Sequence, residues 1–118
     1  MLDTPMIDNL GKYLDLTTRR QAVISSNIAN IDTPGYKTED IDFRSAMNKL
    51  ISDPTATADE VQASQVPGLI ERPDGNNVSM EREGLLLGQS QLQFRAGTAL
   101  LHAQFKILQS AIEEGAKS

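Results

Sequence analysis

The chain has 118 residues, enough for one ordinary domain, and 39% of them are hydrophobic while only 4% are aromatic. Its 16 acidic and 11 basic residues give a net charge of −5, which argues against the basic surface that nucleic-acid binding requires. Because cysteine is absent, the chain can form no disulfide, thiolate nucleophile or cysteine-based zinc site.

The first expected element is a long helix that begins at Thr4-Pro5, since threonine can cap a helix and proline is tolerated at its first position. Apolar residues then recur at spacings of three and four: Ile7, Leu10, Leu14, Ile24, Ile28 and Ile31. This narrow stripe is typical of coiled-coil packing. Thr17 and Gln21 interrupt it, and they indicate either a polar pair that fixes register or an imperfect stripe.

A firm stop is predicted at the end of this helix. Pro34 removes a backbone donor and disfavours the helical region for Thr33. Pro34 and Gly35 fit the central positions of a type II turn, in which glycine supplies the positive φ. Asn27 and Asn30, on the last turns, can bond either the final helix carbonyls or a facing backbone.

The middle of the chain is more polar. A short amphipathic helix is expected over residues 41–51, and Ser52-Asp53-Pro54 ends it. Residues 53–77 contain three prolines and two glycines, which predicts an irregular loop in which Val66 and Leu69-Ile70 are possible docking points. No strand pattern is visible.

A second long helix is expected from an N-cap at Ser79 to a stop at Gly115. Gly84, Gly88 and Gly97 lie inside it and indicate either an imperfect helix or a close approach of two helix backbones. The apolar stripe of this helix comprises Met80, Leu87, Phe94, Leu101, Phe105, Leu108 and Ile112.

These elements predict an all-α fold in which two long terminal helices pair as an antiparallel, coiled-coil-like hairpin, with a short middle helix and an irregular polar loop. The chain is expected to form a single helical domain over residues 1–118, divided into 1–33, 34–78 and 79–115. The second helix should extend past the first, and the part of the second helix that is left without a partner could be covered by the 41–51 helix or by another chain. A hairpin of this kind leaves part of each apolar stripe exposed, so the isolated chain should be only marginally stable without neighbouring chains.

The segment A-N-x-x-T-P-G-Y resembles the signature of the bacterial flagellar rod and hook family, and it is present as Ala29, Asn30, Thr33, Pro34, Gly35 and Tyr36. Residues 37–43 and 74–83 resemble the proximal rod proteins of that family in particular. The resemblance implies a structural subunit that polymerises through its terminal helices into the helical periplasmic drive shaft that transmits motor torque.

The resemblance also implies partners and a route. The expected partners are copies of the chain itself, other flagellar rod subunits, and components of the basal body and the export gate. Export through the flagellar type III route fits an N-terminus that has no basic segment or apolar core of a cleaved signal peptide. No run approaches 18 apolar residues, so no membrane insertion is expected.

Residues for catalysis or metal binding are sparse. His102 is the single histidine and is expected to be a surface or interface residue. Asp40 and Asp42 are too few oxygen ligands for a calcium loop and are expected to be solvated. The chain is therefore expected to have no enzymatic activity, cofactor, metal or small-molecule substrate. The alternatives are another axial rod component, or a soluble helical adaptor or export chaperone.

Overall fold

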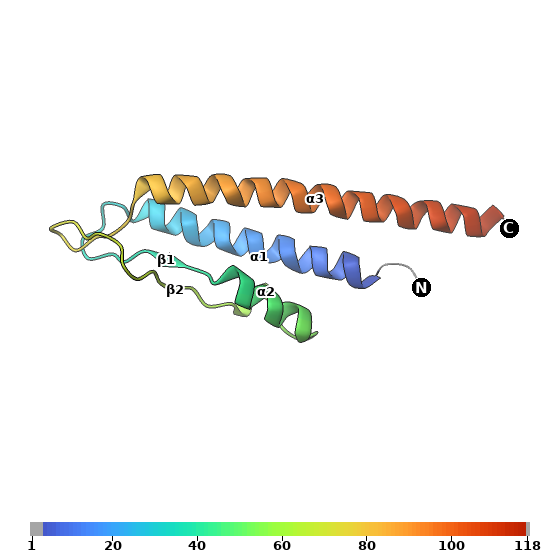
Figure 1. Cartoon of the computed structure of the whole chain (residues 1–118), viewed down its shortest axis with the longest axis horizontal. Coiled ribbons are helices and arrows are strands. Elements are labelled where there is room, and N and C mark those ends of the chain that lie inside the picture. Colours follow the sequence, from blue (N-terminus) through green and yellow to red (C-terminus); the bar gives the residue numbers. More distant parts are fainter. Residues whose placement is uncertain (1–3, 118) are drawn as a thin grey trace.

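The computed structural model describes residues 4–117 as three layers, with α1 (Thr4–Ala29) in the middle (Figure 1). On one side lies α3 (Met80–Lys117), which runs antiparallel to α1. On the other side lie β1 (Glu39–Asp40), α2 (Phe43–Ser52), the short 3-10 helix η1 (Ala58–Glu60) and β2 (Ser64–Gln65). The molecule measures 71 × 26 × 18 Å, so the all-α class and the long hairpin are confirmed.

Side chains cap the starts of α2 and α3, and of these two caps only that of α3 was predicted. The Asp42 carboxylate accepts a hydrogen bond from the backbone N–H of Ser45 and caps α2. The Ser79 hydroxyl accepts a hydrogen bond from the backbone N–H of Arg82, at 3.2 Å, and caps α3 as predicted.

The ends of the long helices differ from the prediction. Regular helix ends at Ala29, and the chain continues as tight turns in which Ile31 and Thr33 donate to the carbonyls three residues back. The stop predicted at Gly115 is wrong, because α3 runs through it to Lys117. Glycine costs a helix interior only about 1 kcal/mol, and Gly115 is not among the positive-φ glycines of the described chain.

The register of α1 against α3 is set by close contacts at two places. The Asn27 amide donates to the Glu83 carboxylate at 2.6 Å. Further along, a Cβ added to Gly97 would lie 2.8 Å from Cδ2 of Leu14 and 3.1 Å from the Tyr13 ring. Gly97 therefore makes room for side chains of α1, which pack tightly against it, and no backbone atom of α1 is among these nearest contacts.

Gly84 and Gly88 behave differently from Gly97. A Cβ added at either position would meet nothing within 4 Å in this chain. They are exposed positions of α3, and the helix is continuous through both, so neither an imperfect or late-starting helix nor a close approach is seen at them within the subunit.

The main apolar core lies between α1 and the middle segment, not between the two long helices. It contains Leu16 and Val23 of α1 with Ile41, Leu50 and Ala58. The ring of Phe43 meets the ring of Tyr13 edge-on, with centroids 5.6 Å apart. Leu16 and Val23 fall outside the predicted stripe because α1 is covered on two faces, and a single stripe describes only one of them.

The segment predicted as an irregular loop is partly regular. β1 and β2 pair antiparallel, with Glu39 opposite Gln65 and Asp40 opposite Ser64. The prediction of a chain without strands is therefore wrong for these short elements. Val66 and Leu69 are half-buried, as expected of docking points, whereas Ile70 is 91% exposed.

The position of α2 shows whether the middle helix covers the end of the second long helix. α2 packs on α1, and the Lys12 ammonium donates to the carbonyl of Leu50 at 2.8 Å. In the described chain, α2 thus lies on the side of α1 away from α3 and does not cover the far end of α3 (Figure 1).

Candidate assembly site

The turn that carries the family-like motif closes the hairpin at one end of the molecule. The backbone N–H of Tyr36 donates to the carbonyl of Thr33 at 3.2 Å, and Gly35 has a φ of 75°. Both features are those of a type II turn, as predicted. The Gly35 N–H donates to the carbonyl of Asp74 at 2.9 Å, which ties this turn to the segment that precedes α3.

Asn76 locks the same two segments together. It is fully buried, and its amide donates to the carbonyls of Asn30 at 2.9 Å and Thr33 at 2.8 Å. The Asn30 side chain donates back to the carbonyl of Ser26 at 2.8 Å, so it bonds a final helix carbonyl. Asn76 therefore adds a second donor to two carbonyls of the turns that follow α1, which also accept from the N–H groups of Thr33 and Tyr36.

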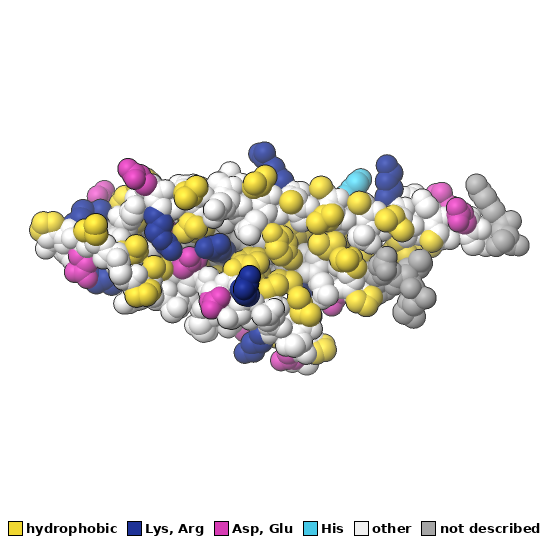
Figure 2. Space-filling model, in the orientation of Figure 1, with side chains coloured by type: hydrophobic (Ala, Val, Ile, Leu, Met, Phe, Trp, Pro, Cys, Tyr) yellow, Lys and Arg dark blue, Asp and Glu magenta, His cyan; other side chains and the backbone are white. Residues whose placement is uncertain are grey.

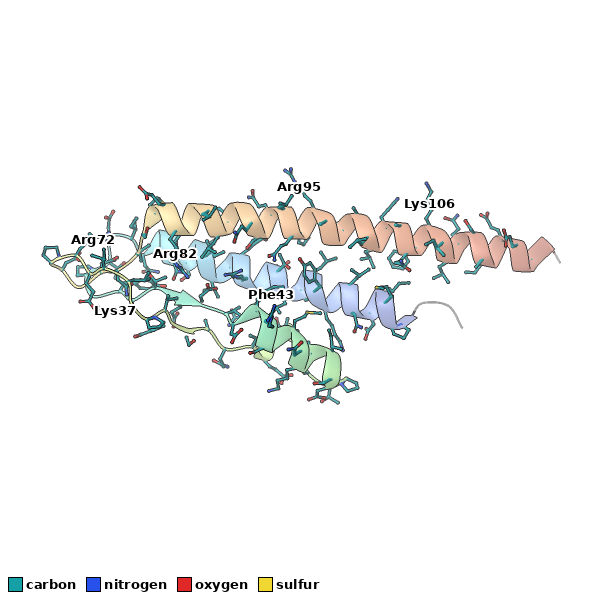
Figure 3. The ribbon with its side chains drawn as sticks, in the orientation of Figure 1. Lys37, Phe43, Arg72, Arg82, Arg95 and Lys106 are labelled. Atoms are coloured by element: carbon teal, nitrogen blue, oxygen red, sulfur yellow. The ribbon has the colours of Figure 1, made fainter. Side chains whose placement is uncertain are left out.

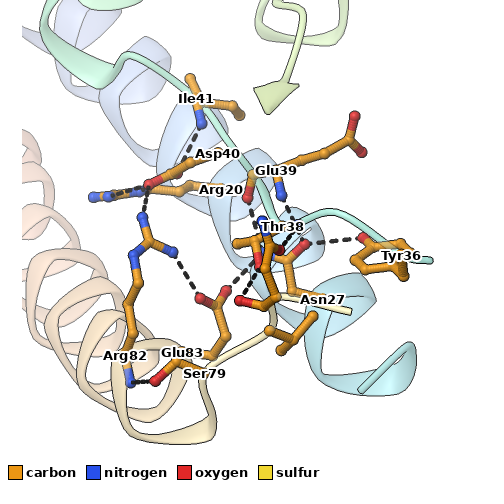
Figure 4. A network of polar contacts seen from close by, with 12 residues as sticks. Arg20, Asn27, Tyr36, Thr38, Glu39, Asp40, Ile41, Ser79, Arg82 and Glu83 are labelled. Atoms are coloured by element: carbon orange, nitrogen blue, oxygen red, sulfur yellow. Dashed lines mark hydrogen bonds and ion pairs between the residues drawn. The ribbon is translucent and has the colours of Figure 1, made fainter. Parts of the chain in front are cut away.

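Asn27 is the centre of a buried polar network (Figure 4). Its amide nitrogen donates to the backbone carbonyl of Glu39 at 2.8 Å and to the Glu83 carboxylate at 2.6 Å. Its oxygen accepts from the Tyr36 hydroxyl at 2.9 Å and from the Glu39 N–H at 3.1 Å. Both amide protons and the amide oxygen are thus engaged, which joins α1, β1 and α3.

Charged side chains extend this network. The Arg20 guanidinium donates to both oxygens of Asp40 at 3.0 Å, and Arg82 donates to Asp40 at 3.2 Å and to Glu83 at 2.7 Å. Burial raises the pKa of Asp40, but the hydrogen bonds from Arg20 and from the backbone N–H of Ile41, with the charges of Arg20 and Arg82, outweigh burial and hold that pKa below its usual value. The expectation that Asp40 is solvated is therefore wrong, and sequence reasoning missed this network because its members lie far apart in the chain.

The predicted motif residues divide into two groups in this structure. Asn30 and Tyr36 are half-buried and contribute side chains to the contacts above, whereas Ala29, Thr33, Pro34 and Gly35 are exposed, and of these Thr33 and Gly35 contribute backbone groups. Their role in assembly stays a prediction.

The fully buried residues of α3, where it meets α1, are polar or small. Glu83, Ser90 and Gly97 recur every seven residues and are buried. Ser90 Oγ and Gln104 Oε1 are buried without a hydrogen-bond partner in the described chain. A search for an apolar stripe does not find these three fully buried positions, because none of them is apolar.

The predicted stripe of α3 lies beside that contact face. Leu87, Leu101 and Leu108 are half-buried. The other members are exposed: Met80 52%, Phe94 38%, Phe105 51% and Ile112 61%. On α1, by contrast, Ile24 is buried and Ile7, Leu10, Leu14, Ile28 and Ile31 are half-buried.

Sequence reasoning missed a second set of apolar residues on α3. These residues are Leu85, Leu92, Leu100 and Ile107, and each is more than half exposed. Hydrophobic atoms accordingly run along α3 in the space-filling view (Figure 2). The charged side chains Arg95 and Lys106 point away from α1 (Figure 3), so α3 has apolar residues on two flanks of its contact with α1.

The remaining candidate residues carry no chemistry of their own. His102 is exposed on α3, as expected, and Asp42 caps α2. Among residues 4–117, no group of three or more histidine and acidic residues is placed to hold a metal. No helix in this range combines the length and hydropathy of a membrane-spanning segment.

Known proteins resemble the chain over most of its length. Residues 14–37 match the family described as "Flagella basal body rod protein". The protein named flagellar basal body rod protein FlgB is 32% identical in Salmonella typhimurium, over 86% of this chain and 88% of that protein. The proteins of the same name in Yersinia enterocolitica and Escherichia coli are 31% identical, over 86% of this chain and 89% and 88% of their own lengths.

Proposed function

Because the chain belongs to the family of FlgB flagellar basal body rod proteins, we propose that it builds the rod by packing the exposed flanks of α3 against neighbouring subunits. The chain is a structural rod subunit of the flagellar basal body and assembles with other rod and basal body components. It is not an enzyme, since its relatives form a structural family.

The observation that supports this interface is the exposure of large apolar side chains along α3. Phe94, Phe105 and Ile112 on one flank and Leu92 on the other remain exposed after α1 has packed. Full burial of one such side chain contributes about 1.5–3 kcal/mol, so a neighbour on either flank would gain substantial stability.

The predicted stripes then have different roles in the two helices. The α1 members, such as Leu14 and Ile24, lie in the contact with α3 or beside it, so they hold the subunit together. The α3 members are available to other subunits. A contact in which one face meets a different face of the next copy propagates into a helical tube, whereas a two-fold contact would end at a dimer.

The turn at Pro34-Gly35 would set geometry in this subunit and not chemistry. It fixes the direction in which the chain leaves α1, and Asp74 and Asn76 lock that direction to the start of α3. The motif residues would thereby hold the two terminal helices at the angle that the rod requires.

The position of the subunit follows from the same family. We propose that it lies in the periplasmic part of the rod, that its neighbours include copies of itself, and that it reaches them through the flagellar export gate. In a strain with an inactive export gate, the chain should remain inside the cell.

The test uses a strain that lacks the chain's own gene. Wild-type chain should restore motility and occur in purified basal bodies, where a density map at side-chain resolution should place α3 among neighbouring helices. The double variant Phe94→Glu, Ile112→Glu should restore neither motility nor incorporation into basal bodies, although it is still expressed, because the two charges would enter a buried contact. Ile51→Glu, at a residue 50% exposed on α2, is the matched control. Normal rods with the double variant would contradict this interface.

A further inference from the structure

We propose that the outer edge of β2 accepts an extended segment of a different basal-body protein, which adds a third strand to the small sheet. The proposal rests on the proposed function, because it names one contact that a rod subunit makes with another component. β1 lies between α1 and β2, so β2 is the outer strand of the two-stranded sheet (Figure 1).

The pairing of the two strands fixes the direction of the backbone groups of β2. Gln65 lies opposite Glu39, and the N–H of the next residue, Val66, donates to the carbonyl of Thr38 at 3.0 Å. In an antiparallel pair, residues that bond across the ladder alternate with residues whose N–H and carbonyl groups point away from it. The backbone groups of Gln65, and of Ala63 two residues earlier, therefore point to the outer edge of β2.

The opposite edge of the sheet has the same alternation and is already covered. The Asn27 amide donates to the carbonyl of Glu39 at 2.8 Å, and its oxygen accepts from the N–H of Glu39 at 3.1 Å (Figure 4). This side chain thus satisfies both backbone groups of Glu39, as a neighbouring strand would. Among the described residues, none caps the outward groups of Gln65 in this way, and Gln65 is exposed.

The outer edge also lacks the features that keep strands from pairing. Natural sheets protect an open edge with charged residues, proline or a bulge. Residues 61–66, with the sequence VQASQV, contain no charged residue and no proline, although 23% of the chain is charged. The register of β1 against β2 is regular, so this edge has no bulge between Ser64 and Gln65. An edge of this kind is suited to strand addition.

A groove continues from this edge and would receive a side chain of the added strand. The groove, the α2 groove, has a volume of about 340 Å³, and its apolar lining residues are Ala46, Leu50, Ala56 and Val61. Gln62, which also lines it, directly precedes Ala63. Strand addition draws affinity from backbone hydrogen bonds and specificity from pockets for alternate side chains. The segment that binds should therefore be extended and should place an apolar side chain in the α2 groove.

The occupant comes from a different protein, because a second copy could not extend the assembly through this edge. Within residues 4–117 the strands are β1 and β2, so the strand edge that a copy could offer is its own β2 edge. Two identical edges paired antiparallel would form a closed two-fold contact, which ends at a dimer. An extended segment of another component leaves the α3 flanks of both proteins available for their own contacts.

A proline substitution tests the edge without touching the β1–β2 ladder. Gln65→Pro removes the outward N–H, and proline is tolerated in an edge strand where the N–H faces away from the ladder. In the strain that lacks the chain's own gene, this variant should be recovered in purified basal bodies about tenfold less than wild type, the effect of losing one backbone hydrogen bond. Gln65→Ala, which keeps the N–H, is the matched control and should be recovered as wild type is. Urea unfolding of the two purified variants should be the same.

Hydrogen exchange and a density map test the contact in the wild-type chain, and they decide the question even if Gln65→Pro unfolds more easily. The N–H groups of Ala63 and Gln65 should exchange fast in the free subunit and slowly in basal bodies, whereas that of Val66 should be protected in both. The map should show a strand of another protein about 4.7–4.9 Å from β2, with an apolar side chain in the α2 groove. Fast exchange at Gln65 in basal bodies, a bare β2 edge, or a β2 strand of a second copy at this edge would overturn the inference.

The two proposals fail in different ways. If the β2 edge is bare although the chain is recovered in basal bodies with its α3 flanks buried, the strand addition is wrong and the proposed function stands. If the wild-type chain is absent from basal bodies, the proposed function itself is wrong.

Discussion

Gly35 is the residue of the turn whose backbone conformation most restricts which amino acids the position can accept. Its φ is 75°, and a Cβ added there would meet nothing within 4 Å, so a substitution acts through the backbone alone. Gly35→Val should destabilise the subunit by about 1–3 kcal/mol, because β-branched residues rarely adopt positive φ. Gly35→Asn should be milder, since asparagine tolerates the left-handed region. Urea unfolding of both variants is the measurement, and equal losses would contradict the type II turn.

Asp40 makes the stability of the subunit depend on pH. Its folded pKa lies below the usual value of 3.8, so its contribution is fully present above pH 3.8 and is lost as the pH falls through the lower folded pKa. Asp40→Asn should cost about 1–3 kcal/mol at neutral pH, because Arg20 and Arg82 lose a charged partner. The variant should also lose less of its unfolding free energy than wild type between pH 5 and acid conditions, which is about the window that denaturation curves can follow. Parallel curves would show that this carboxylate is not coupled to folding.

At the scale of a helix, substitutions at two glycines of α3 should change the stability of the free subunit in opposite directions. Gly88→Ala should stabilise the free subunit by about 0.4–1 kcal/mol, since alanine is the better helix former and the position is open. Gly97→Val should destabilise it by about 1–3 kcal/mol, because its side chain would displace Leu14 and Tyr13. Thermal unfolding of the two variants measures this difference. Similar behaviour would mean that α1 and α3 do not approach closely at Gly97.

The elements also show what could be predicted from sequence. Helix starts are encoded locally, so Thr4-Pro5 and Ser79 mark the two long helices within a residue or so, and the middle helix expected over residues 41–51 is observed at Phe43–Ser52. Strands of two residues have no period to detect, and the Glu39–Gln65 pairing depends on how the loop folds back on α1. The junction around Asn27 was missed for a related reason. It is built from α1, β1 and α3, and only the fold brings these elements together.

At the scale of the whole molecule, α1 is covered on two sides and α3 on one. The middle segment supplies the apolar core through Leu16, Leu50 and their neighbours, whereas the contact of α1 with α3 uses buried Glu83, Ser90 and Gly97. Because these fully buried α3 residues are small or polar, much of the apolar burial in this contact comes from α1 residues such as Leu14 and Ile24. The free subunit should therefore hold α3 more loosely than the rod does.

Hydrogen exchange and one side-chain substitution test whether α3 is held more loosely in the free subunit than in the rod. Exchange over residues 90–112 should be fast in dilute monomer and slow in assembled rod, because neighbours complete the packing of α3. Phe105 is 51% exposed, so Phe105→Ala should change the helix content of the free chain little. It should weaken assembly about 10–100-fold, which corresponds to losing about 1.5–3 kcal/mol of burial. Ile51→Ala, at a similarly exposed residue of α2, should assemble as wild type does. Equal protection of residues 90–112 in both states, together with normal assembly of Phe105→Ala, would mean that this flank faces no neighbour and that the rod contact lies on another surface.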